Sequence, residues 1–377
     1  KKIINYKNLK KKETWLYSAG FNVEKNSSNF SRIDEEIYDL KELMKKKCKV
    51  FLITHQGDFK KKTSKHLFFL KKILREKLKV DVSYYAGKIN RTNMLNLINK
   101  KKVQSITIVG NTRLQKGEQS NSKETAKIYS ILSSKIIIGG FSKVHRKNAS
   151  NNAIINFTKS FLSKGIIKEL KKIEKWKKFS KKNYMIFLGG VKKEKVELGL
   201  AIIAKNFKVV VPSGLVLNTI LKQLNYKIGQ SEYFKDNTLK IVKIFLSKYK
   251  SKIILPSKII VINSFSKKKR TCLLNDVKNN EIIGGFMVSK ELKQKLLKCK
   301  KDEKILLSGT PSLVDKKIYE PTRTISKYLR TMSKNLLILG GDSANDLNFT
   351  KNSNISSGGG AALSYLALNR LEVIDKI

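Results

Sequence analysis

Short apolar runs alternate with helical segments along the whole chain. We expect strands at Val50–Thr54, Val80–Tyr84, Ser105–Val109, Lys135–Ile138, Tyr184–Leu188, Lys208–Val211, Ile259–Ile262, Ile305–Leu307 and Leu336–Leu339. Helical periodicity is expected over 32–46, 64–77, 121–133, 232–248, 289–299 and 322–333. Continuous apolar strands separated by helices are typical of parallel sheets covered on both faces. The pattern therefore predicts an α/β fold with doubly wound, Rossmann-like sheets, in which ligands bind at the carboxyl ends of the strands.

The length of 377 residues suits two domains better than one. Segment 163–182 divides the chain nearly in half and carries apolar residues at helical spacing. Because strands are expected on both sides of it, we predict an interdomain helix there. It would join an N-terminal domain at 1–162 to a C-terminal domain at 183–362. The last segment, 363–377, is expected to pack back towards the N-terminal domain.

Lysine dominates the formal charge of +51. Only nine of the 80 basic residues are Arg, and the lysines are scattered in short runs with few aromatic residues between them. Arg is the residue favoured for forked phosphate and base contacts, and single-strand binding needs stacked aromatic residues. The pattern favours codon drift in an AT-rich genome over a selected polyanion surface. The charge still predicts non-specific binding to nucleic acid.

The sequence carries no signs of export or of a membrane segment. No apolar run approaches the roughly 20 residues of a membrane span, and the N-terminus lacks the apolar region of a secretory signal. Cys48, Cys272 and Cys299 show neither metal-ligand spacing nor a pairing pattern. We therefore expect a cytoplasmic protein.

Two glycine-rich pieces stand near the end of the chain. The run at 336–339 leads into Gly340-Gly341-Asp342-Ser343, and Gly358-Gly359-Gly360 open an apolar segment that favours a helix. Backbone N–H groups at such a helix N-terminus can hold phosphate. Glycine-rich loops also commonly do no more than turn the chain. Together the two pieces predict a phosphate-binding site.

Polar side chains gather at the expected strand ends and at one glycine-containing turn of the first half. His55, Arg113 and Arg146 follow expected strands, and Asn22 and Arg32 lie near the Gly20-Phe21 turn. A single His or Arg at such a place is more often a surface or packing residue. Five polar groups at matching topological positions predict a site for a small anion. In the second half, the glycine turns with Lys192 and Asp342 predict a nucleotide site.

These residues resemble the motifs of the phosphoglycerate kinase family, in the same order and over almost the full length. Ser18-Ala19-Gly20-Phe21-Asn22-Val23-Glu24 is similar to the family's Arg-Val-Asp-Phe-Asn-Val-Pro. The segment 54–59 is similar to Ser-His-Leu-Gly-Arg-Pro, and 110–114 to Glu-Asn-Leu-Arg-Phe. Gly140-Phe141-Ser142-Lys143-Val144-His145-Arg146 is similar to Ala-Phe-Gly-Thr-Ala-His-Arg.

The resemblance continues through the second half. Gly189-Gly190-Val191-Lys192 is similar to the family's Gly-Gly-Ala-Lys, and the segment 307–315 to Trp-Asn-Gly-Pro-Pro-Gly-Val-Phe-Glu. The two glycine-rich pieces resemble Gly-Gly-Asp-Thr and Ser-Thr-Gly-Gly-Gly-Ala-Ser. The resemblance implies a monomeric glycolytic kinase that reversibly transfers a phosphoryl group from 1,3-bisphosphoglycerate to Mg-ADP, giving ATP and 3-phosphoglycerate. The N-terminal domain would bind phosphoglycerate, the C-terminal domain would bind Mg-ADP or Mg-ATP, and a hinge would close.

The resemblance also implies a role for each matching residue. Arg32 would stabilise the transferring group and Asn22 would bind the hydroxyl or carboxylate end of phosphoglycerate. His55, Arg113 and Arg146 would hold its phosphate. In the second domain Lys192 would reach the nucleotide phosphates, Asp342 would serve Mg²⁺ and Asp315 would contact the ribose. Catalytic roles fall on Arg32, Lys192, Gly341 and Gly359, and further nucleotide contacts on Gly190, Lys195, Gly285, Gly340, Ser343, Gly358 and Gly360.

Several positions depart from the family's motifs. Ser18 and Gly20 stand where the family has Arg and Asp, and Asp58 stands where it has Arg. Lys195 comes one position before the second nucleotide lysine, and Gly285 is followed by Phe where Pro is expected. These departures keep an alternative open: a catalytically inactive relative, recruited by its basic surface to RNA or a ribonucleoprotein.

Overall fold

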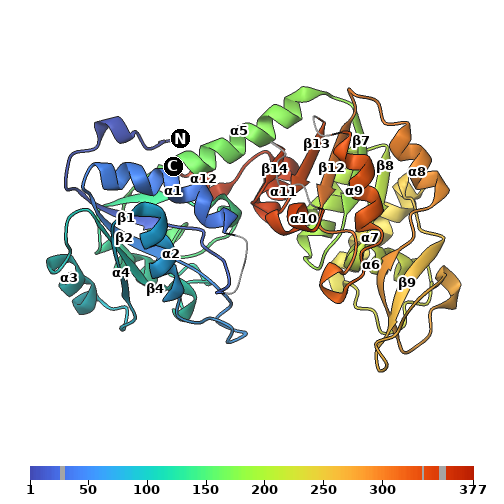
Figure 1. The fold of residues 1–377 in the computed structure, drawn as a ribbon, viewed down its shortest axis with the longest axis horizontal. Helices are drawn as coiled ribbons and strands as arrows, with labels where there is room; N and C mark the ends of the chain where they lie inside the picture. Colours follow the sequence, from blue (N-terminus) through green and yellow to red (C-terminus); the bar gives the residue numbers. More distant parts are fainter. Residues whose placement is uncertain (26–29, 333–334, 348–353) are drawn as a thin grey trace. The chain divides into compact units, whose positions relative to one another are not determined.

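The computed structural model describes residues 1–25, 30–332, 335–347 and 354–377, and only the backbone of Asp342 (Figure 1). The chain forms two compact units. Unit 1 consists of Lys1–Lys171 and Arg370–Ile377, and unit 2 of Lys172–Asn369. Each unit contains a parallel sheet with helices packed around it, which confirms the predicted α/β fold class.

Unit 1 is built on a six-stranded parallel sheet in the order β3-β4-β2-β1-β5-β6. Its strands are β1 (Thr14–Ser18), β2 (Lys49–Thr54), β3 (Asp81–Tyr85), β4 (Ser105–Asn111), β5 (Lys135–Ile138) and β6 (Lys159–Leu162). Its helices include α1 (Ser31–Lys45), α2 (Phe69–Leu78), α3 (Arg91–Asn99) and α4 (Lys123–Ser130). Because the strands are parallel, the carboxyl ends of β4, β2, β1 and β5 lie side by side along one edge of the sheet.

The two ends of the chain meet within unit 1 (Figure 1). The backbone N–H of Lys2 donates to the carbonyl oxygen of Ile377 over 2.9 Å, and the N–H of Leu162 donates to the carbonyl oxygen of Lys2 over 2.8 Å. The short helix α12 (Glu372–Asp375) is held by an ion pair of 2.9 Å between Glu372 and Lys147. Of the segment predicted to pack back, only 370–377 belongs to unit 1.

Unit 2 contains two sheets. A five-stranded parallel sheet has the order β14-β13-β12-β7-β8, and a three-stranded antiparallel sheet has the order β10-β9-β11. The strands are β7 (Asn183–Leu188), β8 (Val209–Pro212), β9 (Lys258–Asn263), β10 (Lys269–Leu273), β11 (Glu281–Phe286), β12 (Lys304–Ser308), β13 (Leu336–Leu339) and β14 (Ile355–Ser356). The helices include α6 (Gly214–Gln223), α7 (Asp236–Tyr249), α8 (Lys290–Leu297), α9 (Thr322–Arg330), α10 (Gly341–Asp346) and α11 (Gly359–Leu368).

All nine expected strands form, but one lies in a different kind of sheet. The run Ile259–Ile262 becomes β9, which pairs antiparallel with both of its neighbours instead of joining the parallel sheet. A five-residue turn folds β10 back onto β9, so the pairing is local. The elements that were not predicted are strands β1, β6, β10, β11 and β14 and helices α3, α6, α10 and α12. The expected interdomain helix is α5 (Lys164–Phe179), and the two units divide within it, between residues 171 and 172.

Candidate functional site

The anion-binding side chains predicted in the first half meet at the carboxyl edge of the unit 1 sheet. His55 directly follows β2, and Arg113 follows β4 in a short helical turn. Arg146 lies in the loop after β5, and Arg32 is the second residue of α1. The guanidinium Nη1 of Arg32 donates to the carbonyl oxygen of Asn22 over 2.5 Å, which links α1 to the loop after β1.

His55 lies at the centre of this group and is only 5% exposed. Burial holds the pKa of His55 well below its usual range, and four surrounding cations lower it further. The cations are Lys143, Arg113, Arg146 and Arg32. The imidazole is therefore neutral at neutral pH and can donate a hydrogen bond to an anion. The structure thus gathers Arg32, Arg113 and Arg146 around His55, as the strand-end pattern predicted.

Arg113 is buried, with 3% of its surface exposed, and among the described residues its Nε atom has no hydrogen-bond partner. Burial lowers the pKa of Arg113. The negative charges of Glu118 and Asp58 partly offset this effect. A buried guanidinium nitrogen without a partner is costly unless a ligand supplies the acceptor. Phosphate and carboxylate oxygens fit the planar fork of Arg in this way. The edge of unit 1 is therefore suited to a small anion.

The carboxylate of Asp58, which would repel a bound anion, is engaged in hydrogen bonds within unit 1. It accepts from the side-chain nitrogen of Gln119 over 2.8 Å and from the backbone N–H of Lys61 over 3.0 Å. These bonds hold the pKa of Asp58 below its usual value. The carboxylate therefore caps the loop after β2, although its charge still reaches Arg113.

Sequence reasoning missed three charged side chains beneath this edge. Lys143, Glu36 and Glu118 are each no more than 2% exposed. Two of them left a signal in the sequence. Lys143 stands three residues before Arg146 where the family motif has Thr, and Glu36 follows Arg32 by one helical turn and so shares its face of α1.

In unit 2, glycine allows the loops after β7 and β12 to touch. Gly309 has φ +102°, and a Cβ atom there would lie 2.3 Å from the carbonyl oxygen of Gly189. Position 309 therefore excludes any larger residue, and a Cβ atom on Gly189 would lie 2.1 Å from the hydroxyl oxygen of Ser213. Gly190 follows Gly189 and leads into the loop that carries Lys192.

Lys195 and Lys192 lie close enough for the charge of Lys192 to lower the pKa of Lys195. The larger cause is burial, and together they bring the pKa of Lys195 to about 8. Its ammonium is 2.5 Å from the hydroxyl oxygen of Ser308, the last residue of β12. Lys195 opens a π-helical segment, Lys195–Ile203, and its ammonium reaches the carboxyl edge of the parallel sheet.

The two glycine-rich pieces come together at the end of β13. Gly340 has φ +108°, and its N–H donates to the carbonyl oxygen of Ser356 over 2.7 Å. A Cβ atom on Gly359 would lie 3.3 Å from the Cα atom of Gly340. Gly358 precedes α11 and has no side chain that could cap the first N–H groups of this ten-residue helix, and a helix N-terminus of this kind can bind phosphate. Ser343 is buried in α10, and the side chain of Asp342 lies outside the described residues.

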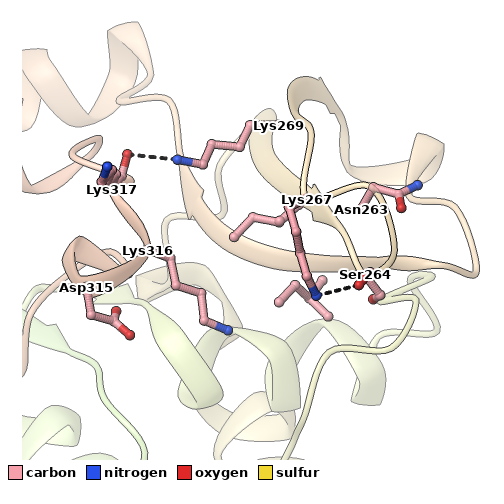
Figure 2. Close-up of a pocket in the computed structure, with 9 residues that line it drawn as sticks. Asn263, Ser264, Lys267, Lys269, Asp315, Lys316 and Lys317 are labelled. Carbon is pink, nitrogen blue, oxygen red and sulfur yellow. Dashed lines mark hydrogen bonds between the residues drawn. The ribbon is translucent and has the colours of Figure 1, made fainter.

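Asp315 lines a pocket of about 470 Å³ (Figure 2). Figure 2 shows Asp315 and Lys316 on one side of it and residues of the β9–β10 hairpin on the other. The lining residues are Ile262, Asn263, Ser264, Lys267, Lys269, Ile282, Asp315, Lys316 and Lys317. Gly285 is a packing position: a Cβ atom there would lie 2.3 Å from the carbonyl oxygen of Glu320.

The described residues show neither a preformed metal cage nor a membrane helix. Across them, no three His, Cys, Asp or Glu side chains cluster as ligands would. Nor does any helix in this part of the chain combine the length and apolar character needed to cross a membrane. Mg²⁺ commonly needs only one or two carboxylates, because substrate phosphates and water complete its shell. A single carboxylate beside the glycine loops is therefore compatible with it.

Comparison with known proteins agrees with this geometry. The sequence model of the phosphoglycerate kinase family matches residues 8–368. The chain is 30% identical over 289 residues to the phosphoglycerate kinase of Wigglesworthia glossinidia brevipalpis, covering 73% of this chain and 71% of that protein. It is 26% identical over 383 residues to that of Clostridium botulinum, covering 97% and 96%.

Solved structures show the same fold. The phosphoglycerate kinase of Pyrococcus horikoshii has a TM-score of 0.75 at 18% identity, covering 97% of this chain and 96% of that one. The structure from Coxiella burnetii has a TM-score of 0.70 at 21% identity, covering 98% and 97%. The family model spans both units, so the chain belongs to the phosphoglycerate kinase family.

Proposed function

We propose that this chain is a working phosphoglycerate kinase that transfers a phosphoryl group between the carboxyl group of 3-phosphoglycerate and ADP or ATP. Membership of the phosphoglycerate kinase family indicates kinase activity. The observation that supports retained activity is the set of cations around the buried, neutral His55. Three arginines remain at this edge although only nine occur in the whole chain.

In unit 1, we assign the phosphate of phosphoglycerate to His55, Arg113 and Arg146. The neutral imidazole donates one hydrogen bond, and the two guanidinium groups supply charge and forked donors. Asn22 binds the hydroxyl or carboxylate end. Arg32 neutralises charge on the transferring phosphoryl group, which lowers the barrier because this chemistry depends on positioning and electrostatics.

In unit 2, we assign the nucleotide phosphates to Lys192 and Lys195 and to the N–H groups of the glycine-rich pieces. These donors lie at Gly190, Gly340, Gly341, Gly358, Gly359 and Gly360. Asp315 contacts the ribose from its pocket. Asp342 would hold Mg²⁺, which supplies positive charge to the phosphate oxygens when it is bound. Ser343 and Gly285 support these loops.

The carboxyl group as acceptor has a direct test. Purified protein with ATP, Mg²⁺ and 3-phosphoglycerate should form an acyl phosphate, which hydroxylamine traps as a hydroxamate. Glycerol 3-phosphate has no carboxyl group and should give no hydroxamate. ATP consumption without hydroxamate would mean a different acceptor. No consumption at all would leave the inactive, RNA-recruited alternative, which no relative named above supports.

We further propose that the protein is a monomer in the cytoplasm.

A further inference from the structure

Three ionisable side chains are buried beneath the anion-binding edge of unit 1. Glu36 and Glu118 are each 1% exposed, and Lys143 is 2% exposed. Moving a charge out of water is costly unless nearby groups compensate for it. Such a cluster therefore needs an explanation beyond packing.

The ammonium of Lys143 lies at the carboxyl end of β1, one of the two central strands of the sheet. Its Nζ atom donates to the Oγ atom of Ser18, the last residue of β1, over 2.5 Å. Ser18 in turn donates to the carbonyl oxygen of Ser150 over 2.6 Å. Of the four cations that lower the pKa of His55, Lys143 contributes most. Lys143 is thus part of the positive surroundings of the proposed phosphate site.

Glu36 occupies space that glycines leave open. Its Oε1 atom accepts from the N–H of Gly20 over 2.7 Å. A Cβ atom on Gly139 would lie 2.1 Å from the Oε2 atom of Glu36, so any larger residue at position 139 would displace the carboxylate. The loops after β1 and β5 therefore form a cradle for a side chain that comes from α1.

Other charges face Lys143 from several elements. Glu36 on α1 and Glu118 after β4 favour its charged form, whereas Arg113 opposes it. Glu118 is fixed by the backbone N–H and the hydroxyl of Ser150, over 3.1 and 2.6 Å. Because burial is the largest effect, it lowers the pKa of Lys143 and raises that of Glu36. An added negative charge at the edge above would favour protonation of both groups.

The charged cluster and the residues that contact it differ from the family motifs at three positions. The family carries Arg and Asp at the end of the first strand, where this chain has Ser18 and Gly20. It carries Thr where this chain has Lys143. At the end of β1 the chain therefore lacks the cation and the carboxylate of the family motif. It has a cation, Lys143, after β5 where the motif has Thr, and the carboxylate of Glu36 accepts from the N–H of Gly20.

We propose that Lys143, supported by Glu36 and Glu118, replaces the missing cation at position 18 and acts as a positioning residue for the phosphate ester bound in unit 1. The proposal rests on the function proposed above. Lys143 does not touch the ligand. It supplies positive charge beneath His55 and Arg113. When the anion binds, the buried Lys143–Glu36 pair takes up a proton.

The test is isothermal titration of the full-length protein with 3-phosphoglycerate in buffers of different ionisation enthalpy, from pH 7 to 9. The ligand phosphate stays a dianion over this range. Wild type should take up a fraction of a proton on binding, and its affinity should fall about tenfold over the range as Lys143 loses its proton. Lys143→Met should bind at least about tenfold more weakly at pH 7 and show little of this decline. Lys143→Arg should recover the affinity at pH 7 and hold it to pH 9.

Lys101→Met is the matched control. Lys101 is also a buried lysine of unit 1, 8% exposed, with its ammonium 2.8 Å from the hydroxyl oxygen of Thr107. It precedes β4 and so lies towards the other end of the sheet from Arg113. Its replacement should leave both affinity and proton uptake unchanged.

The outcomes separate this inference from the proposed function. If wild type binds but Lys143→Met binds equally well with the same proton uptake, Lys143 is only structural and the inference fails while the kinase function stands. If wild type neither binds 3-phosphoglycerate nor forms ATP, the proposed function fails and the inference with it. Should Lys143→Met not fold, Glu36→Gln serves instead: proton uptake identical to that of wild type would overturn the inference.

Discussion

Lys195 donates a hydrogen bond from its buried ammonium to the Oγ atom of Ser308, over 2.5 Å, at the carboxyl end of β12. Unit 1 repeats the arrangement, since Lys143 donates to Ser18 at the end of β1. In each unit, a serine that ends a central parallel strand therefore holds a buried lysine at the edge where ligands bind.

Replacing Lys195 should weaken nucleotide binding without affecting phosphoglycerate. Lys195→Met removes a cation beside the proposed nucleotide phosphates, and we expect an affinity for ADP about 10-fold lower. Because the pKa of Lys195 is about 8, the wild-type affinity should also fall as pH rises above 8, where the ammonium loses its proton. Calorimetric titration with ADP measures both effects. Lys205→Met, at an exposed lysine of the same unit, is the control, and equal affinities would refute the assignment.

Arg113 should be important for phosphoglycerate binding. Arg113→Met removes a buried guanidinium with an unpaired Nε atom, and we expect the KM for 3-phosphoglycerate to rise about 10- to 100-fold, because a charged hydrogen bond is worth about 1.5–3 kcal/mol. Arg113→Lys should recover only part of the loss, since an ammonium cannot form the same fork. Arg91→Met, at an exposed arginine, should leave the KM unchanged. A KM in Arg113→Met equal to that of wild type would exclude it from the site.

Gly20 should tolerate no side chain. A Cβ atom there would lie 2.6 Å from the Cα atom of Gly140 and 3.3 Å from the Oε1 atom of Glu36. Gly20→Ala should therefore destabilise the protein by about 1–3 kcal/mol, which a lower midpoint of thermal unfolding would reveal. Gly87→Ala should cost less, because the nearest atoms belong to the side chain of Tyr85, which can move. An unchanged midpoint in Gly20→Ala would contradict the close packing of these loops.

The basic surface gives a separate prediction about RNA. If the charge of +51 reflects codon drift, RNA binding should be weak, independent of sequence and lost as salt rises. Fluorescence anisotropy with two unrelated single-stranded RNAs at 50 and 200 mM salt would measure this. Tight binding of one RNA at 200 mM would instead favour a selected partner.

The sequence predicted the meeting of His55 with Arg113, Arg32 and Arg146 because the fold class determines it. Parallel strands with helical crossovers place every strand end at one edge, so residues after different strands become neighbours. Short continuous apolar runs located nine strands, because most of these strands are buried on both faces; β3 and β9 are partly exposed.

The sequence could not predict what depends on side-chain direction. Glu36 comes from α1 and reaches the loop after β5, which carries Lys143, where Gly20 and Gly139 leave space for its carboxylate. Strand β9 looked like a parallel strand because Ile259–Ile262 is uniformly apolar, yet a local turn pairs it antiparallel with β10. Likewise, no pattern in the sequence indicated that Lys195 opens a π-helical segment and reaches Ser308.

The chain is proposed to catalyse phosphoryl transfer, with Arg32 neutralising charge on the transferring phosphoryl group. Steady-state ATP formation from 1,3-bisphosphoglycerate and Mg-ADP, measured with wild type, Arg32→Ala and Arg75→Ala, tests this proposal most directly. Arg75 is an arginine of unit 1 that pairs with Asp81 at the surface, over 3.1 Å. We predict turnover in wild type and Arg75→Ala, and a kcat at least about 100-fold lower in Arg32→Ala. A wild type without turnover, or an Arg32→Ala variant as fast as wild type, would contradict the account.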